Sequence, residues 1–347
     1  MALQPMITVG FILLSVWIAG LTTRRRLLGH LGWQMASAVV ALGGMLANWL
    51  TPDWAGWSTA TLFVLLVAAP LECLARASGA AQRGQWKKAA RFHSWAALLH
   101  PTPWTRFGAA LARTRSTDGP AGYTAALQKI EATGSRKQKT LARLLLAHDQ
   151  RDWDRLLMLS RAADIALAEV KPREIRALGE LGRLEEMVQT YRAAAKWLLP
   201  PIRRECMLFV LAFTGGVERV QQLLDGPLSA IGDESKTYWL AVVRVRRDPN
   251  DNAGRSMLRE LSAGSIQDGV ARSAARHLRQ ASEGRNVSLS LSDDAQRAVA
   301  AIGAAEGSRL HELRQWNKRT RRARVIAALC LTLLAVVWAV LQAHYGW

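Results

Sequence analysis

The sequence predicts an all-α protein in which four transmembrane helices, three N-terminal and one C-terminal, flank a cytoplasmic helical-repeat solenoid. Three observations support this fold class. Long apolar runs lie near both ends of the 347-residue chain. The segment between them is rich in Ala, Leu and Arg, which favour helix. Aromatic and glycine residues recur in that segment about every 33 residues, as in repeats built from helix pairs.

Three apolar runs open the chain and a fourth lies near its end. We expect transmembrane helices at residues 6–21, 33–50 and 57–74, within an N-terminal region 1–75, and at residues 325–343. Their lengths approach the 30 Å or so of the hydrocarbon layer. A cleaved secretory signal is the alternative for the first run. Such a signal carries its positive charges before the apolar stretch, whereas Arg24 to Arg26 follow it, so we interpret the run as a permanent span.

The net charge of +19 is concentrated between the apolar runs. All but three of the 46 Lys and Arg residues lie between Arg76 and Arg324. Because basic loops stay on the cytoplasmic side, residues 76–308 are expected in the cytoplasm and both termini outside, with the spans in the cytoplasmic (inner) membrane. Residues 309–324 form a basic juxtamembrane segment. The bases nearest the spans are expected to contact anionic lipids: Arg24, Arg25, Arg26, Lys87, Lys88, Arg314, Lys318, Arg319, Arg321, Arg322 and Arg324.

The stretch "GQWKKAARFHSWAALLHP" (Gly84–Pro101) sets the register of the repeat. Weaker copies begin near "GYTAALQKI", "RDWDRLLML", "GRLEEMVQTY" and "GGVERVQQLL". One helix pair cannot bury its apolar face alone, so such pairs stack on their neighbours. We expect the glycines to form tight turns, the rings to fill gaps and the alanine to permit close approach. The residues assigned to this packing are Gly84, Trp86, Ala89, Tyr123, Trp153, Gly182 and Gly215.

Residues that could support catalysis or bind metal are scattered. The seven histidines have no cysteine or carboxylate at ligand spacing, and Cys73, Cys206 and Cys330 are far apart. The fragment "GWST" (Gly56–Thr59) has a G-x-S shape but no histidine partner in another span, and a serine without a base is a poor nucleophile. We therefore expect no cofactor and no metal. The basic segment adjoins a span, which favours lipid contact over nucleic-acid binding.

The order of these parts resembles the N-terminal membrane and tetratricopeptide-like region of bacterial rhomboid-family intramembrane serine proteases. The sequence segments on which the resemblance rests are "IRALGELGRLEEMVQTY", "MLFVLAFTGGVERVQQLLDGPL", "TYWLAV" and "RGQWKKAARFHSWAALLHP". The resemblance implies that the last span corresponds to the first helix of the catalytic bundle. The serine and histidine of that family would lie in later spans, beyond Trp347, so no catalytic residue is assigned here.

Two functions follow from these observations. The first is a non-enzymatic membrane protein whose helical repeat docks a protein or peptide partner, because stacked helix pairs form a concave groove. The second is the regulatory N-terminal part of a rhomboid-family protease. In both, the basic excess predicts acidic partners or contact with an anionic membrane surface.

Overall fold

The computed structural model describes residues 3–24, 30–198, 200–229, 231–265, 268–283 and 291–302. Within these ranges all regular secondary structure is helical, which confirms the all-α class. The chain divides into two compact units, Met1–Ala295 and Gln296–Trp347. The predicted basic segment 309–324 and fourth span 325–343 lie outside the described residues, as does Cys330.

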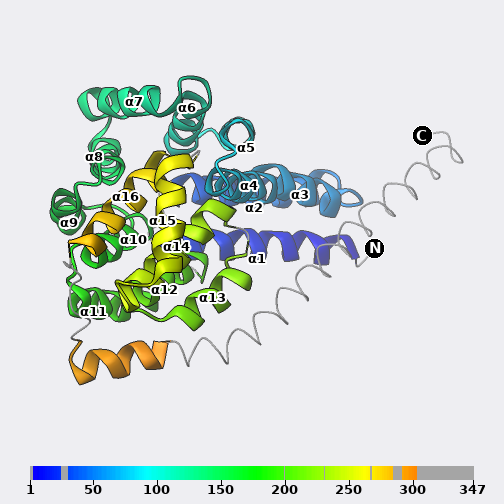
Figure 1. Cartoon of the computed structure of the whole chain (residues 1–347). Helices are drawn as coiled ribbons and strands as arrows, with labels where there is room; N and C mark the ends of the chain where they lie inside the picture. The colour runs from blue at the N-terminus through cyan, green and yellow to red at the C-terminus, as the bar shows by residue number, and fades with distance from the viewer. Residues whose placement is uncertain are drawn as a thin grey trace, which may run out of the picture. The chain divides into compact units, whose positions relative to one another are not determined.

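The first unit begins with apolar helices and continues with shorter amphipathic ones (Figure 1). The first group is α1 (Leu3–Arg24), α2 (His30–Leu50), and a continuous run made of α3 (Ala55–Phe63), the π-helical turn η1 (Val64–Ala68) and α4 (Ala69–Gln82). The second group is α5 (Trp86–Leu99), α6 (Pro103–Thr117), α7 (Gly119–Thr133), α8 (Arg136–Gln150), α9 (Trp153–Ala162), α10 (Leu167–Glu180), α11 (Leu184–Ala195), α12 (Pro200–Phe213), α13 (Val217–Asp225), α14 (Asp233–Arg247), α15 (Asn252–Gly264) and α16 (Asp268–Ser282).

Helices α1, α2 and α3 pack against one another along their lengths (Figure 1). Hydrogen bonds join them at two levels: Ser37 Oγ donates to the Ser15 carbonyl at 2.7 Å, and Gly56 N–H donates to Gln4 Oε1 at 3.0 Å. The second bond fixes the start of α1 beside the start of α3. Among the described residues one helix, Ala55–Ala81, is long and apolar enough to cross a membrane, and Gln4–Gly20 is apolar but shorter.

The π-helical turn in the middle of the third apolar run comes directly before Pro70. Proline has no N–H to donate to the carbonyl four residues earlier, and its ring would strike that carbonyl in an ordinary α-helix. Widening the preceding turn removes the clash without breaking the helix. The predicted boundary at residues 75 and 76 therefore falls inside one uninterrupted helix that ends at Gln82.

Five helix pairs between α4 and α13 are joined by turns that contain one residue with positive φ. These residues lie about 33 residues apart: Gly84 (φ 69°), Gly119 (66°), Arg151 (60°), Gly182 (75°) and Gly215 (80°). Left-handed backbone is accessible to glycine but strained for residues with a Cβ. Arg151 is thus an outlier, in the place that the other four turns give to glycine.

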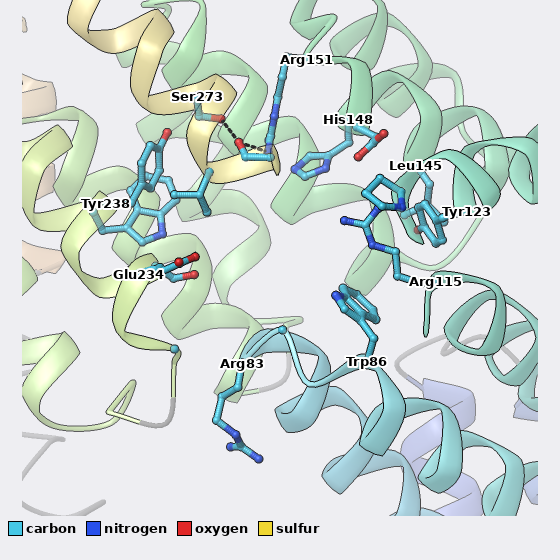
Figure 2. Close-up of a pocket in the computed structure, with 18 of the residues that line it drawn as sticks. Arg83, Trp86, Arg115, Tyr123, Leu145, His148, Arg151, Glu234, Tyr238 and Ser273 are labelled. Atoms are coloured by element: carbon cyan, nitrogen blue, oxygen red, sulfur yellow. Dashed lines mark hydrogen bonds between the residues drawn. The ribbon is translucent and has the colours of Figure 1, made fainter. Parts of the chain in front are cut away.

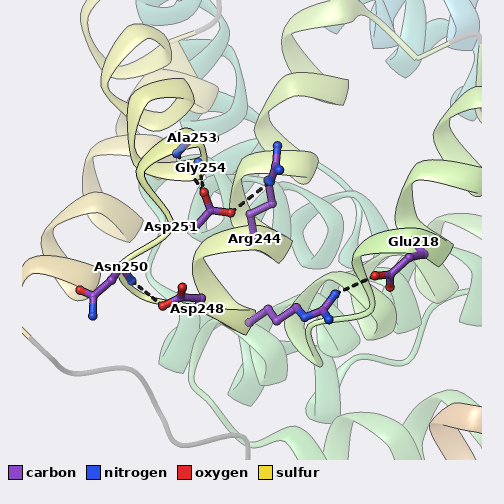
Figure 3. Close-up of polar contacts among 8 residues, drawn as sticks. Glu218, Arg244, Asp248, Asn250, Asp251, Ala253 and Gly254 are labelled. Carbon is purple, nitrogen blue, oxygen red and sulfur yellow. Dashed lines mark hydrogen bonds and ion pairs between the residues drawn. The ribbon is translucent and has the colours of Figure 1, made fainter.

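The turn between α14 and α15 is built from aspartates instead of a left-handed residue (Figure 3). Asp251 Oδ1 accepts from Ala253 N–H at 2.9 Å and Gly254 N–H at 3.2 Å, which caps α15. Its Oδ2 accepts from Arg244 Nε at 3.1 Å, and Arg247 pairs with Glu218 of α13 at 2.7 Å. Ser292 Oγ accepts from Ala295 N–H at 3.4 Å, which is the geometry of an N-cap.

The interior of the helical domain is apolar and closely packed. Helix α10 contacts α12, α12 contacts α14, and α14 contacts α16. The first helices of successive pairs therefore lie against one another. The largest fully buried side chains are Leu127, Leu144, Leu156, Ile175, Leu178, Met187, Met207, Leu208, Leu211, Phe213, Leu224 and Leu258. The apolar helices join this domain through Trp33 of α2, whose ring stacks on His100 with centroids 4.1 Å apart.

Candidate functional site

A pocket of about 790 Å³ lies where several helix ends of the first unit meet (Figure 2). Its wall comes from the turn between α4 and α5, the start of α7, the end of α8, and the first turns of α14 and α16. The residues that line it include four arginines and four aromatic rings: Arg83, Arg115, Arg151, Arg176, Trp86, Tyr123, Tyr238 and Trp239. The pocket therefore combines positive charge with apolar surface.

Arg115 of α6 lies between two aromatic rings, as Figure 2 shows. Its guanidinium carbon is 5.5 Å from the centroid of Trp86 and 5.6 Å from that of Tyr123. These cation–π contacts hold the side chain without occupying its in-plane N–H groups. Nη1 is buried and makes no hydrogen bond within the described chain.

Arg151 reaches the pocket from the strained turn between α8 and α9. Its Nη2 donates to the Gly269 carbonyl at the start of α16, at 2.8 Å, and its guanidinium lies 5.5 Å from the Trp153 ring centroid. The buried Nε and Nη1 have no hydrogen-bond partner among the described residues. A non-glycine residue at positive φ whose side chain enters a pocket suggests a functional constraint.

Arg176 of α10 forms the floor of the pocket. Its side chain is 15 % exposed and lies over Trp153, Phe209 and Trp239 at 5.2 to 5.7 Å. The nearest carboxylate oxygen, from Glu180, is 3.8 Å from Nε, beyond hydrogen-bond range. Aromatic rings thus contact all three guanidiniums, and Glu180 is the acid nearest to Arg176.

The positive field in the pocket is visible in its titratable groups. Burial lowers the pKa of His148 well below its usual value, and Arg176, Arg151 and Arg173 lower it further, so His148 is neutral. Burial and the neighbouring Arg176 lower the pKa of Arg151 to about 10. Arg151 therefore stays protonated at neutral pH, and burial is the main cause of the lowered pKa.

The acidic residues of the pocket wall have partners of their own. Asp149 lies 3.7 Å from Arg272 and accepts from Thr124. Glu234 accepts from Ser265 at 2.9 Å, and Asp233 lies 3.6 Å from Lys236. These carboxylates therefore do not satisfy the buried nitrogens of the three arginines.

A buried ionic network formed by Glu180 and His277 lies next to Arg176. Glu180 is 1 % exposed and lies 3.3 Å from His277 Nε2, which is itself 3 % exposed. Burial alone would raise the pKa of Glu180, but His277, Arg176 and Arg276 hold it at about 2. The carboxylate is therefore ionised at neutral pH and fixes the position of Arg176.

The residues predicted to pack the repeat occupy two kinds of position. Gly84, Gly182 and Gly215 have left-handed backbone in inter-helix turns, and Ala89 is fully buried. The three aromatic residues, Trp86, Tyr123 and Trp153, all contact arginines of the pocket. Tyr123 lies in the second turn of α7, not at the helix start as Trp86 and Trp153 do.

Arg115, Arg151 and Arg176 are not among the site residues predicted from the sequence. A usable signal was present for Arg151, which occupies the position two residues before Trp153. Glycine occupies that position before Trp86 and Leu184. Arginine in a turn that favours glycine indicates that the side chain has a separate role. No comparable sequence signal distinguishes Arg115 or Arg176 from other basic residues.

The residues predicted to contact lipid are described only in part. Lys87 and Lys88 are exposed in the first turn of α5, and the same exposed face continues through Arg91, Trp95 and Leu98. Arg24 is the last residue of α1. The remaining predicted residues lie outside the described ranges: Arg25, Arg26, Arg314, Lys318, Arg319, Arg321, Arg322 and Arg324.

Exposed apolar side chains gather on the N-terminal helices. All but four of the large exposed ones lie on α1, α2 and the α3–α4 run or in the turn before it, the exceptions being Trp95, Leu98, Met158 and Trp197. The set comprises Met6, Val9, Leu13, Leu14, Val16, Trp17, Leu31, Met35, Val39, Leu42, Met45, Leu46, Trp49, Leu50, Trp54, Trp57, Val64, Leu65 and Leu71. Such a concentration of exposed apolar side chains on neighbouring helices is typical of contact with a membrane or a partner.

Metal-binding geometry is not present in the part of the chain that the structure describes, where no three His, Cys, Asp or Glu residues form a suitable group. Cys73 and Cys206 are free thiols, and burial raises the pKa of Cys206. Comparison of the sequence with protein-family models, with curated proteins and with solved structures finds no match. The resemblance to rhomboid-family proteases therefore stays a prediction that rests on the sequence segments quoted above.

Proposed function

We propose that the chain is an integral membrane protein whose cytoplasmic helical domain is a tetratricopeptide-like scaffold for a protein or peptide partner. The observation that carries the membrane part is the apolar surface of α1, α2 and the α3–α4 run. In water, such a surface would cost roughly 25 cal/mol for each Å² left exposed, whereas lipid covers it without cost. In this proposal all three are spans, and residues 325–343 form the fourth.

The scaffold part rests on the regular spacing of the helix pairs. Turns about 33 residues apart, with first helices in contact, are what a tetratricopeptide-like solenoid requires. Such stacks bind extended segments on one face. The pocket lined by Arg115, Arg151 and Arg176 lies among the helix ends of this stack and offers a candidate contact surface.

The orientation follows from the ends of the apolar helices. The bond between Gly56 and Gln4 brings the starts of α1 and α3 together, so Arg24 lies toward the other end of the bundle, as do Arg76 and Arg83. Because bases favour the cytoplasmic side, the proposal places the helical domain there.

Single cysteines test this topology. Thr51→Cys lies in the exposed turn before α3 and Arg136→Cys at the exposed start of α8, each in a chain without its own cysteines. In spheroplasts, a membrane-impermeant maleimide should label the first and leave the second unlabelled until the membrane is permeabilised. Labelling of both before permeabilisation, or of Arg136→Cys alone, would contradict the proposed orientation.

A further inference from the structure

The pocket between the helix ends contains guanidinium nitrogens that form no hydrogen bond with its own residues. Buried nitrogens of three guanidiniums, Arg115 Nη1, Arg151 Nε and Nη1, and Arg176 Nε, have no hydrogen-bond partner in the described chain. Buried donors normally form hydrogen bonds, and a buried donor without an acceptor is energetically unfavourable. Anionic oxygens are the acceptors that guanidinium forks bind best.

The starts of α5, α7, α14 and α16 add to this charge, because all four contribute residues to the pocket wall. A helix N-terminus carries unpaired N–H groups and a partial positive charge. The N-cap residues Gln85, Asp118 and Gly232 make no side-chain capping bond to α5, α7 and α14. This electrostatic environment favours an anionic ligand.

The rings of the pocket argue against a nucleotide. The Trp86 and Tyr123 rings contact Arg115, and Arg176 lies over Trp239, so these rings are already engaged by guanidiniums. A nucleobase would need such a ring to stack on. The guanidinium N–H groups that lack a hydrogen-bond partner are the groups left to bind a ligand.

The size of the pocket argues against a bare ion. A volume of about 790 Å³ far exceeds the 30 Å³ or so that one water occupies in the liquid, and it lies in the range of organic-ligand sites. Apolar side chains such as Leu145 and Val270 line part of it, and Asp233 and Glu234 stand on the α14 side. Carboxylates there can accept hydrogen bonds from the N–H groups of a peptide.

We propose that this pocket binds a short acidic segment of a partner protein, whose carboxylates are held by Arg115, Arg151 and Arg176. This proposal rests on the docking function proposed above, and it specifies the chemistry of the docked partner. It also accounts for Arg151: the turn accepts an unfavourable backbone conformation, and the guanidinium reaches a position that a glycine could not provide.

The test uses the full chain in nanodiscs of zwitterionic lipid and a fluorescein-labelled peptide of ten glutamates, followed by fluorescence anisotropy at low salt. The matched peptide of ten glutamines should not bind. Arg115→Gln and Arg151→Gly should each weaken glutamate binding about tenfold or more. The matched controls, Arg113→Gln and Arg155→Gln, remove the same charge at exposed positions outside the pocket wall and should change binding less than about twofold.

Arg151→Gly also separates binding from folding. The other turns of this type use glycine, so the variant should melt at the same temperature as the original chain or higher while it loses the peptide. Pocket variants that bind as the controls do would overturn the proposal. So would inorganic phosphate that displaces the peptide at equal concentration, because it would show a site for a bare anion.

A panel of unrelated, mixed-composition peptides in the same assay distinguishes this proposal from the docking function itself. Specific binding of a non-acidic peptide, unaffected by Arg115→Gln, would contradict the acidic pocket and leave the docking function standing. If neither the glutamate peptide nor any peptide of the panel binds, both the acidic pocket and the docking function are contradicted.

Discussion

Gly179 of α10 illustrates how closely the helical domain is packed. A Cβ added there would lie 2.2 Å from Cδ2 of Phe213, which is fully buried in α12. The contact is with the body of a ring rather than with a flexible chain end, so α10 and α12 would have to separate. Glycine at this position is therefore a requirement of helix packing, although its backbone is helical.

Gly179→Ala should lower the free energy of unfolding by about 1 to 3 kcal/mol, despite the better helix propensity of alanine. Chemical denaturation of the detergent-solubilised chain would measure this. Gly264→Ala is the matched control, because nothing lies within 4 Å of the added Cβ. We expect the control to be neutral or slightly stabilising. Equal effects of the two substitutions would contradict the packing argument.

Single residues also show where prediction from sequence stops. The glycine and ring pattern indicated the turns at Gly84, Gly182 and Gly215, because backbone geometry depends on local residue type. It did not indicate that Trp86, Tyr123 and Trp153 hold arginines. Arg115 and Arg176 resemble ordinary basic residues of a solvated helix face, and only the packing of distant helices removes them from water.

At the scale of elements, α15 depends on a single capping side chain. Asp251 accepts from two N–H groups at the start of the helix and also pairs with Arg244 (Figure 3). The capping bonds contribute more than the ion pair, because Arg244 is 40 % exposed and exposed pairs are screened by water. The two contributions can be separated by two substitutions.

Asp251→Ala should destabilise the helical domain by about 1 kcal/mol, whereas Asp251→Asn should retain most of the stability because the amide oxygen can still cap. Thermal unfolding of both variants at low and high salt would show this order. If Asp251→Asn proved as damaging as Asp251→Ala, the ion pair with Arg244 would be the dominant contribution instead.

Helix existence was predictable from sequence, but helix continuity was not. The apolar runs at 6–21, 33–50 and 57–74 correspond to α1, α2 and the α3–α4 run. The last of these extends to Gln82, because the change from apolar to polar composition after Leu74 does not end a helix. Pro70 did not end it either, because a wider turn accommodates the proline ring.

At the scale of the whole molecule, the apolar surface of the N-terminal helices gives the sharpest test of membrane insertion. Leu42 faces outward from α2 and is 67 % exposed. An arginine near the middle of a transmembrane helix costs about 2.5 to 3.5 kcal/mol in insertion experiments. Met158 of α9 is exposed to a similar extent, 62 %, but lies in the helical domain.

Leu42→Arg should therefore reduce the fraction of protein that resists alkaline carbonate extraction, while Met158→Arg should leave that fraction unchanged. Quantitative blotting of membrane and soluble fractions would measure it. A Leu42→Arg chain that stays as firmly in the membrane as the Met158→Arg chain would contradict a lipid-facing α2.

The three guanidiniums of the pocket have a thermodynamic consequence for the whole helical domain. The repulsion between Arg151 and Arg176 is present in the folded chain and relaxes when the chain unfolds, so it opposes folding whenever no anion is bound. A ligand that binds only the folded state adds stability by mass action, about 2.7 kcal/mol at a hundredfold excess over Kd. Helices α8, α10 and α16 should then exchange their amide hydrogens more slowly. Occupancy of the pocket and rigidity of the surrounding helices would thus rise together. The bound partner would then act as a structural component of the helical domain.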